Sequence, residues 1–555
     1  MSCFTDFLKD GLSSSAALQA AVAAAVNGDR KLFFPPGEYH FYPEHCPQRY
    51  CCFSNNDEGV KTVAILLEDV EDFTVSGYGA LLIFHGRISP LCAFNCRKLT
   101  VEGLRVDFED SFVSDADLVR RGNGVAWFRF GGRHRVDNGK IVFTGDFYDN
   151  LSGVLPFHSY DPGRGEIDFS SVTVSIPNRN IRYENGLVGV EDRFDGVTAS
   201  AFMVKHELRL CPGMVFDNCR DIQINAVTLY HAAGMGFLIQ NSENCTIDSA
   251  VIEPRGRRAS VSDDALHITD CRGKIKISRC RFSGTLDDSI NVHGVFRKLK
   301  SRIPGGKMYY LEPGHYQQQG VFNVRPGDHL QLLRRSDGMP YATLELTGTK
   351  LVNKALMVVD FDEKQLPASF TEGDPGWILE TRAELEITDT VCRSMSNRGI
   401  LASGLEKIRI CGCHFHTAGA GVFISGDFSY WYESGPVGGA VIENNFFDNC
   451  CYNPRGATKE VLAVFPELRS LKEDFCYHNH ICVRNNRFRS RRKTLISMMS
   501  VEHAEVKNNC FEEDQTYTLA YETKAGYFFT DENSPMAAFL HCSRIECENN
   551  CGFHD

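Results

Sequence analysis

"HICVRNNRFRS" at residues 480–490 returns 23 residues later as "HAEVKNNCFEE" at 503–513, with the Asn pair and the apolar positions in register. Each segment alternates apolar and polar residues and then bends, which is typical of a short β-strand followed by a turn. Similar segments recur along the chain: "CRKLTVEGLRVDF" (96–108), "CRDIQINAVTLYH" (219–231), "SENCTIDSAVIEP" (242–254), "CRGKIKISRCRFSG" (271–284), "LEKIRICGCHFHTA" (405–418), "GGAVIENNFFDNC" (438–450) and "SRIECENNCGF" (543–553).

A repeat of this length predicts a parallel β-helix. One coil of about 20–30 residues cannot bury its own apolar face, so successive coils must stack and share a core. Stacked coils would bring the Asn residues at equivalent bends into a hydrogen-bonded ladder. A β-propeller is the competing architecture, but its blades need about 40 or more residues in antiparallel meanders.

Residues 13–41 predict a cap for the first coil. The Ala-rich run indicates a helix that Ser13 or Ser14 caps and that ends near Gly28, followed by a strand and a Pro-Pro-Gly turn. A helix laid over the first coil would cover an open sheet edge that otherwise favours aggregation.

Two segments interrupt the repeat. Residues 109–205 and 297–380 contain strand patterns separated by Gly, Pro and Asp turns but show no coil period, so we expect two inserted antiparallel β domains that resemble small barrels. The chain then divides into an N-terminal cap with the first coils, an inserted domain, coils with paired aspartates, a second inserted domain and C-terminal coils: 1–108, 109–205, 206–296, 297–380 and 381–555.

Composition argues against several classes of partner. The 555 residues carry a net charge of -12, whereas nucleic acids and anionic membranes require a basic surface. The longest apolar stretch, 16–26, is too short to span a bilayer and is interrupted by Gln19. The chain as given shows no export signal, so we expect a cytoplasmic protein, or a periplasmic or secreted one if a signal peptide was removed.

The 22 cysteines are too sparse for a disulfide scaffold in a chain of this length, and no C-x-x-C occurs. So many free thiols favour a reducing compartment. Many lie in strand-like runs, where we interpret them as small apolar core residues: Cys219, Cys245, Cys271, Cys280, Cys411 and Cys413.

Two aspartate pairs lie one repeat apart, in "SDDALHITDC" (262–271) and "LDDSINVHGV" (286–295). If one coil spans this interval, aligned residues stack one rung apart, at roughly 4.8 Å, and two or three carboxylates gather on one outer surface. The alignment stacks four pairs of positions: Asp263 on Asp287, Asp264 on Asp288, His267 on Asn291, and Thr269 on His293.

Carboxylates this close raise the pKa of at least one of them, so a protonated acid can stand beside an ionised base or nucleophile. Cleavage of a glycosidic bond needs that division of labour. A separation of about 5 Å favours retention and about 6.5–9.5 Å favours inversion, and the sequence leaves the distance open. Two other interpretations stay open: turn residues that cap backbone amides, and a calcium site.

His231, His267 and His293 lie on or beside the same strands. They are either hydrogen-bonded surface residues or groups that bind sugar hydroxyls and tune a neighbouring pKa. Because they lack a compact ligand motif, we predict no zinc site, and we expect no metal or cofactor.

A third stretch, "SGDFSYWYESGPVGG" (425–439), sets aromatic residues beside Asp427 and Glu433 in a glycine-bounded loop. Trp431 could stack on the apolar face of a sugar while the two carboxylates accept its hydroxyl protons. A packed corner loop is the alternative. With three Trp in the chain, one placed beside acids in a loop favours a binding role.

The combined motifs resemble glycoside hydrolase family 110, the α-1,3-galactosidases that remove terminal galactose from blood-group-B-type and related glycans. The similarity runs through nearly the whole chain, and the "WYESGPV" loop is its most specific element. It rests on six stretches: "LFFPPGEYHFYPE" (32–44), "YHAAGMGF" (230–237), "DALHITDCRG" (264–273), "DDSINVHG" (287–294), "NRGILAS" (397–403) and "GDFSYWYESGPV" (426–437).

The resemblance implies an all-β fold, a right-handed parallel β-helix with two inserted β-barrel domains. It also implies an inverting, metal-independent mechanism with three aspartates, Asp264, Asp287 and Asp288. We favour Asp287 as general acid, with the other two holding or deprotonating the attacking water. Asp263 departs from the family pattern, in which a small residue precedes the first aspartate. By position, substrate would be bound by His231, His267, Asn291, His293, Asp427, Trp431 and Glu433.

The expected function is therefore hydrolysis of terminal α-1,3-linked galactose, with an oligosaccharide or glycoconjugate as partner. Neither nucleic acid nor membrane insertion is expected, and a homodimer stays open. A polygalacturonase-like hydrolase of acidic glycans is one alternative, since Arg255, Arg257 and Arg258 could provide a basic subsite. A non-catalytic glycan-binding β-helix is the other, and it would not need the stacked acids.

Overall fold

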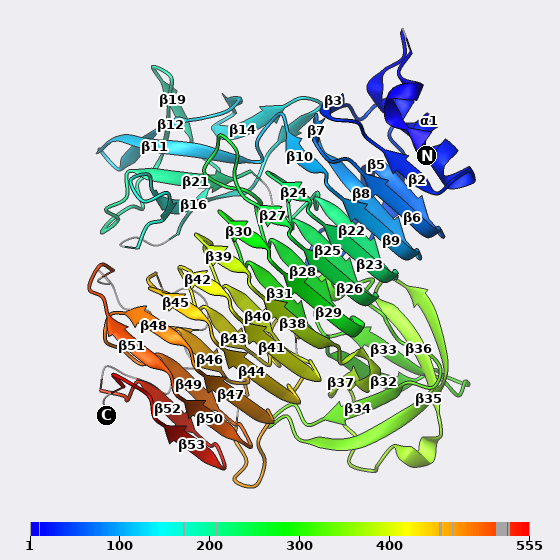
Figure 1. The fold of residues 1–555 in the computed structure, drawn as a ribbon, viewed down its shortest axis with the longest axis vertical. Helices are drawn as coiled ribbons and strands as arrows, with labels where there is room; N and C mark the ends of the chain where they lie inside the picture. Colours follow the sequence, from blue (N-terminus) through cyan, green and yellow to red (C-terminus); the bar gives the residue numbers. More distant parts are fainter. Residues whose placement is uncertain are drawn as a thin grey trace.

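The chain winds into an elongated stack of β-coils with two antiparallel units attached to it (Figure 1). The computed structural model describes residues 2–9, 11–169, 173–206, 209–433, 435–453, 458–468, 470–517, 530 and 533–553. The predicted fold class, a parallel β-helix with two inserted antiparallel units, is confirmed.

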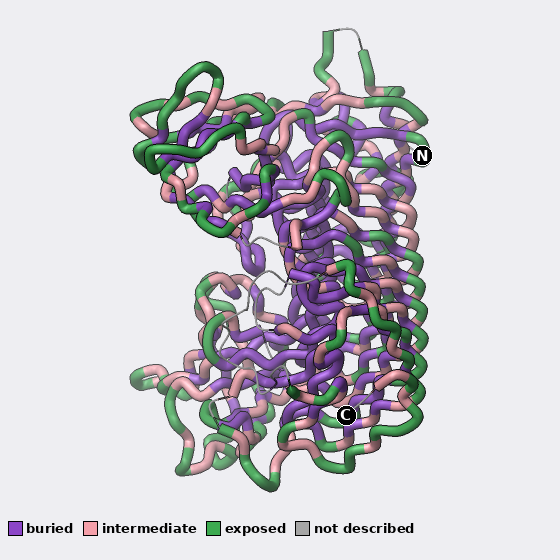
Figure 2. Tube along the Cα trace, turned by 90° about the vertical axis from the view of Figure 1, so that its left-hand side faces the viewer, coloured by how far each residue is buried: buried purple, intermediate pink, exposed green. Residues whose placement is uncertain are grey.

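Three long sheets form the sides of the stack, with 13, 11 and 12 strands among the described residues. We call the 12-stranded sheet the site sheet. Its strands β25 (Phe237–Gln240), β28 (Leu266–Thr269), β31 (Ile290–His293) and β40 (Ile400–Ala402) pair in parallel, one rung above the next. Figure 2 shows that the buried chain runs along the whole stack, while exposed residues gather at the outer turns and insertion tips.

Alternate residues of each strand point inward and form one core. In the site sheet, Leu266 and Ile268 of β28 and Ile290 and Val292 of β31 all belong to this core and are almost fully buried. Because side chains alternate along a strand, the residues between them, such as His267, face outward. The outer face of the site sheet is therefore free to carry polar chemistry.

Pairs of asparagines define one corner of the last coils. The side-chain amide of Asn445 donates to Asn486, that of Asn486 to Asn509, and that of Asn509 to Asn550, each at 3.0 Å. The first Asn of each pair, such as Asn485 with φ 57°, adopts the left-handed backbone conformation that Asn tolerates well. The predicted ladder is thus confirmed, and the pair combines a bend with a buried amide.

Helix α1 (Ser14–Asn27) lies against the first coil, where it contacts β2 (Lys31–Phe33), β3 (Gly37–Phe41) and β5 (Gly59–Glu68). The Ser13 side chain accepts from the backbone N–H of Ala16, and Gly28 is the C-cap, as predicted. Within the described residues, no helix is long and apolar enough to cross a bilayer.

The two antiparallel units leave the stack at opposite ends of the site-sheet strands. The first follows β10 (Arg105–Phe108) and precedes β22 (Met214–Asp217), whereas the second follows β31 and precedes β38 (Glu384–Thr388). The second is a closed barrel. Its strands, in barrel order, are β32 (Arg297–Arg302), β33 (Tyr309–Pro313), β36 (Leu356–Phe361), β35 (Pro340–Asn353), β34 (His329–Leu333) and β37 (Pro375–Ile378).

The first unit is an eight-stranded sheet with a separate three-stranded sheet of β13 (His134–Asp137), β14 (Lys140–Gly145) and β15 (Tyr148–Asn150). It differs from the expected barrel because its apolar face is not covered by closure of the sheet. Instead Ile141 and Phe143 of β14 share a core with Phe128 and Phe157 of the larger sheet.

All 22 cysteines lie within the described residues, and each is a free thiol. The main core contains five of the six cysteines named from the sequence: Cys219, Cys245, Cys271, Cys280 and Cys413. The interpretation of strand cysteines as small apolar residues is confirmed for these, whereas Cys411 is only partly buried.

We expect the Asn486→Ala variant to lose about 1–3 kcal/mol of unfolding free energy, because it removes the side-chain hydrogen bonds that Asn486 makes with the backbone carbonyl of Ile442 and the backbone amide of Asn445 in the buried corner. Denaturant titration of the whole chain measures this loss. The matched control is Asn444→Gly, an exposed position with a left-handed φ of 57° that glycine adopts freely. An equal effect in both variants would contradict the ladder's contribution.

Candidate active site

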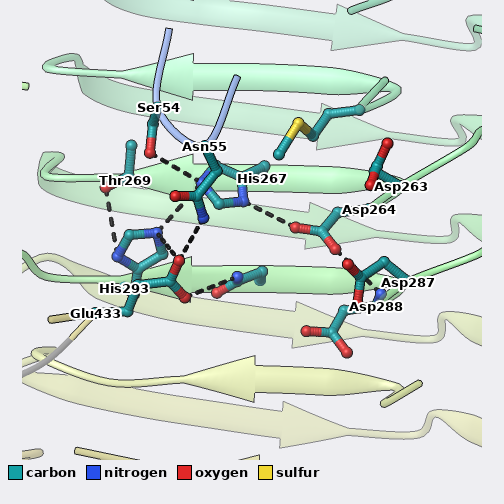
Figure 3. A network of polar contacts seen from close by, with 12 residues as sticks. Ser54, Asn55, Asp263, Asp264, His267, Thr269, Asp287, Asp288, His293 and Glu433 are labelled. Atoms are coloured by element: carbon teal, nitrogen blue, oxygen red, sulfur yellow. Dashed lines mark hydrogen bonds and ion pairs between the residues drawn. The ribbon is translucent and has the colours of Figure 1, made fainter. Parts of the chain in front are cut away.

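The two aspartate pairs lie at one corner, immediately before strands β28 and β31 (Figure 3). The strands pair with His267 beside Asn291 and Thr269 beside His293, which is the alignment expected from the repeat. The backbone N–H of Asp288 also donates to the carboxylate of Asp264 at 3.1 Å. One 24-residue coil therefore stacks the second pair on the first.

A cavity of about 380 Å³ opens over this corner. Its wall combines residues from the site sheet with residues from the N-terminal segment, the chain just after the first insertion and the coils after the barrel. The lining residues are Asn55, Arg209, Asp264, Asp287, Asp288, Asn291, Asn397, Arg398, Leu401, Ser425, Asp427, Tyr430, Trp431, Glu433 and Glu467.

Three aspartates meet in this cavity. Asp264, Asp287 and Asp288 each have a carboxylate oxygen within 4.8 Å of the others. Asp264 and Asp288 are nearly fully buried, whereas the side chain of Asp287 is 20% exposed, so Asp287 is the most accessible to a ligand. Three carboxylates at this separation do not all ionise independently.

Arg398 binds Asp288 through three N–H groups. Its backbone amide and Nε donate to Oδ1 at 2.8 and 2.9 Å, and its Nη2 donates to Oδ2 at 2.9 Å. Burial nevertheless raises the pKa of Asp288 to about 7, with Arg398 opposing the shift and Asp287 and Asp264 adding to it. A pKa near neutrality is what a proton-transfer group requires.

Arg209 links Asp287 to the neighbouring aspartate of the first pair. Its Nη2 donates to Asp287 at 3.1 Å and its Nε donates to Asp263 at 3.0 Å. Lys205 also donates to Asp263 at 2.9 Å. Although burial opposes ionisation, Lys205 and Arg209 hold the pKa of Asp263 well below its usual range. Asp263 is therefore an ionised structural partner of Arg209 and lies outside the cavity lining.

The third aspartate, Asp264, faces His267, whose Nδ1 lies 2.8 Å from its Oδ2. Burial raises the pKa of Asp264 well above its usual range, and the neighbouring charge of Asp287 adds to this shift. Burial lowers the pKa of His267 to about 4. In this pair the carboxyl group therefore keeps its proton more readily than usual, whereas the imidazole takes up a second proton less readily than usual.

Glu433 lies at the opposite end of this network (Figure 3). Its carboxylate accepts from the amides of Asn55 and Asn291, and its Oε1 is 3.8 Å from Nε2 of His293. Burial opposes its ionisation, whereas any positive charge on His293 or His267 and the two amides that donate to it lower the pKa of Glu433. Glu433 is therefore an anion in the cavity wall.

Asp427 organises the aromatic loop. Its two carboxylate oxygens accept from the backbone amides of Ser429, Tyr430, Trp431 and Tyr432. Four amides on one carboxylate hold the loop in a single conformation. Trp431 then lies over the guanidinium of Arg209, whose carbon is 5.6 Å from the ring centroid.

The structure gathers most of the residues named from the sequence. Asp264, Asp287, Asp288, Asn291, Asp427, Trp431 and Glu433 line the cavity, while His267 and His293 are buried behind its wall. His231 does not reach the cavity lining. It is fully buried, accepts from the backbone N–H of Phe112 and donates to the carbonyl of Ser260. A substrate contact through His231 is therefore not available in this arrangement.

Several cavity residues were not foreseen from the sequence. Asn55, Arg209, Arg398 and Glu467 come from segments without a repeat motif or an aspartate pair. The stretch "NRGILAS" contains Asn397 and Arg398 and is one of the six stretches that carry the family resemblance. That resemblance was the one signal in the sequence that could have pointed to Arg398. Glu467 is a further acid, because burial and then Asp427 raise its pKa to about 7.

The three aspartates are close enough to share a cation, and His40–His85–Glu109 and His480–His503–Glu505 meet the same distance criterion elsewhere in the described residues. At the aspartates, Arg209 and Arg398 already supply positive charge to Asp287 and Asp288. We therefore interpret the trio as proton-transfer groups.

Part of the inserted barrel matches a known family model, and most of the chain matches known proteins. The family model "GLAA-B beta-barrel domain II" matches residues 311–375. "Alpha-1,3-galactosidase B" of Phocaeicola vulgatus is 27% identical over 96% of this chain and 91% of its own length. "Alpha-1,3-galactosidase A" of Bacteroides fragilis (strain YCH46) is 26% identical over 91% of this chain and 85% of its own. The resemblance to glycoside hydrolase family 110 is confirmed.

Solved structures are more distant. The A-module of the mannuronan C-5 epimerase AlgE6 from Azotobacter vinelandii covers 99% of each chain, with a TM-score of 0.39 and 10% identity. No residue role follows from a likeness of this size.

We expect Asp264→Asn to stabilise the protein by about 1–2 kcal/mol at pH 8. The pKa of Asp264 is higher in the folded than in the unfolded protein. The stability that its bound proton contributes is therefore fully present below the unfolded pKa of about 3.9 and is lost as pH rises through the higher folded pKa. An Asn cannot ionise, so the gain over wild type should shrink toward pH 4. Thermal unfolding across this pH range measures it.

The adjacent Asp263→Asn variant is the matched control. It removes one partner of a buried ion pair with Lys205 and Arg209 and should cost about 3–5 kcal/mol. If both variants destabilise the protein equally at pH 8, the inferred protonation of Asp264 is wrong.

Proposed function

We propose that this protein is an inverting exo-α-1,3-galactosidase that hydrolyses terminal α-1,3-linked galactose from blood-group-B or linear α-galactosyl glycans. The observation that carries the proposal is the cluster of three aspartates with oxygens within 4.8 Å. The relatives named α-1,3-galactosidase, which match over most of the chain, support it. The cavity of about 380 Å³ lies near the lower end of small-molecule sites, as expected for one terminal sugar.

The mechanism requires Asp287 to take up a proton before the reaction, which it then donates to the glycosidic oxygen as the bond to the anomeric carbon breaks. A water held by Asp264 and Asp288 attacks the opposite face through an oxocarbenium-like transition state and loses its proton to one of them. The usual inverting separation of about 6.5–9.5 Å applies to two carboxylates. A third carboxylate allows two to hold the water while the first delivers the proton, which makes a tighter cluster compatible with inversion.

Asn291 and Glu433 are suited to bind sugar hydroxyls. Asn291 lines the cavity, and its Oδ1 has no hydrogen-bond partner among the described residues, although it is buried. Buried acceptors are normally paired, so a ligand hydroxyl is the expected partner. The anionic Glu433 can accept a second hydroxyl, and Trp431 offers a flat apolar surface to the sugar ring.

A uronic acid is a poorer match than a neutral sugar. Arg209 and Arg398 are the cations of the cavity lining, and each is paired with aspartates. The arginines considered from the sequence are engaged elsewhere: Arg255 and Arg257 with Asp107, and Arg258 with Asp117. Within the described part of the chain, the site therefore offers a substrate carboxylate no unpaired cation.

Asp287→Asn should lower kcat for α-galactosides by about 10²–10⁴-fold, because the Asn cannot donate a proton to the leaving oxygen. Galactose release from nitrophenyl α-galactoside, linear α-1,3-digalactoside and branched B trisaccharide measures this. The exposed Asp137→Asn variant in the first insertion is the control and should match wild type. Binding without turnover by wild type across the panel would favour a glycan-binding protein, and cleavage of galacturonides would favour the acidic-glycan alternative.

The first sugar released from an α-linked substrate should be β-galactose, because one displacement inverts the anomeric carbon. ¹H NMR of the anomeric proton, recorded before mutarotation, distinguishes the two products. Initial release of α-galactose would show double displacement and contradict the inverting mechanism.

A further inference from the structure

Two buried imidazoles connect Asp264 with Glu433 behind the cavity wall (Figure 3). Nδ1 of His267 is 2.8 Å from Oδ2 of Asp264, and its Nε2 is 3.2 Å from Nε2 of His293. Each contact needs one proton between its two atoms. The fixed donors and acceptors around the imidazoles decide where those protons lie.

The first constraint comes from a backbone carbonyl. Nδ1 of His293 is 2.9 Å from the carbonyl oxygen of Gly294, which can only accept, so this nitrogen carries a proton. Burial lowers the pKa of His293, which favours the neutral ring. The Nε2 of a neutral His293 is then an acceptor, and His267 must donate to it from its own Nε2.

The second constraint starts at Glu433 and follows a separate path. The ionised carboxylate only accepts, so the side-chain NH₂ of Asn55 donates to it and the Oδ1 of Asn55 is left as an acceptor. The amide nitrogen of Gln318 donates to that oxygen at 3.3 Å. The Oε1 of Gln318 therefore faces Ser54 as an acceptor.

The path ends on the same imidazole nitrogen. Ser54 donates its hydroxyl proton to Oε1 of Gln318 at 2.9 Å. Its oxygen lies 3.3 Å from Nε2 of His267 and has only lone pairs left to offer. Two independent paths therefore place a proton on Nε2 of His267.

With Nε2 protonated, Nδ1 of a neutral His267 is an acceptor, and the proton of the contact with Asp264 must come from the carboxyl group. We propose that Asp264 is a carboxylic acid in the resting protein, with its proton on Oδ2 donated to Nδ1 of His267. Two groups set this polarity together: the Gly294 carbonyl through His293, and Glu433 through Asn55, Gln318 and Ser54. The raised pKa of Asp264 and the lowered pKa of His267 agree with this placement.

In the proposed mechanism Asp264 and Asp288 hold the attacking water, and the proton placement gives them different roles. This consequence rests on the proposed function. A protonated Asp264 cannot take a proton from water. Asp288, which Arg398 holds through three N–H groups, is then the base. His267 is a positioning residue, because it acts on the reaction only through the protonation state of Asp264.

Charged groups from several elements act on Asp264 and His267. Asp287, Asp263 and Glu433 act on Asp264 as negative charges, and Arg209 acts as a positive one. Glu433, Asp287 and Asp288 also act on His267, as does Arg209. His293 contacts His267 directly, and the positive charge of Arg398 interacts with Asp264.

Long-range ¹H–¹⁵N NMR of the full chain labelled with ¹⁵N-histidine tests the proposal at pH 7 without substrate. A His267→Gln variant assigns the His267 signals. We expect His267 as the neutral Nε2–H tautomer, with the downfield ¹⁵N shift of an unprotonated Nδ1, and His293 as the Nδ1–H tautomer. An Nδ1–H tautomer or an imidazolium at His267 would overturn the placement.

The same spectra of two matched variants test the role of Glu433. The Glu433→Gln variant removes one of the two constraints, because a Gln side chain can donate as well as accept. The constraint from the Gly294 carbonyl remains, so His267 should lose part but not all of its Nε2–H population. Glu467→Gln is the control, because Glu467 lies in the same cavity without a link to the path, and its spectrum should match wild type. Identical His267 signals in Glu433→Gln and wild type would overturn the role assigned to Glu433.

If Glu433→Gln does not fold, Asp264→Asn provides a second test. An Asn can donate its amide N–H to Nδ1 of His267, as the carboxylic acid does, so the Nε2–H tautomer should persist. Loss of that tautomer would count against Asp264 as the donor. Since these measurements need no turnover, failure of the proton placement and failure to release galactose are separate results.

Discussion

The structure depends on one constraint, the parallel stacking of coils at a spacing of one rung. Backbone hydrogen bonds between neighbouring strands hold residues about two dozen positions apart directly above one another. The same stacking puts alternate side chains into a continuous core and the others outside. Two aspartate pairs that are distant in the chain thus become neighbours at one corner, next to a sheet whose outer face carries polar residues.

Stacking alone would bring together carboxylates that repel one another. Two kinds of contact offset this repulsion. Arg209 and Arg398 pair with Asp287 and Asp288, while Asp264 faces a buried imidazole. Burial makes both devices necessary, because a carboxylate away from water must be paired or protonated. Proteins commonly give up some stability at such sites in exchange for reactive groups with shifted pKa values.

The two insertions and the N-terminal segment convert an open sheet face into a cavity. Arg209 follows the first insertion, Gln318 belongs to the barrel, and Ser54 and Asn55 come from the N-terminal segment. These residues cover the outer face of strands β28 and β31, so His267 and His293 are removed from water. Without water as an alternative partner, each imidazole nitrogen has a fixed hydrogen-bond partner, so the donors and acceptors of the network are fixed as well.

The coil repeat, the Asn ladder, the capping helix and the stacking of the aspartate pairs followed from the sequence alone, since each depends on a local period or a local turn. The cavity did not. Arg209 and Glu467 carry no motif, and the stretch that contains Arg398 does not reveal its partner, because their positions in the cavity depend on contacts between segments far apart in the chain. His231 shows the converse. The sequence repeat suggested that it shares the strands of the aspartate pairs, but it lies just after β24 (Thr228–Leu229) of the 11-stranded sheet, where contacts with Phe112 and Ser260 use both of its nitrogens. Periodicity in the sequence determined which residues stack, whereas the tertiary structure decided which of them meet a ligand, because that depends on what covers each side chain.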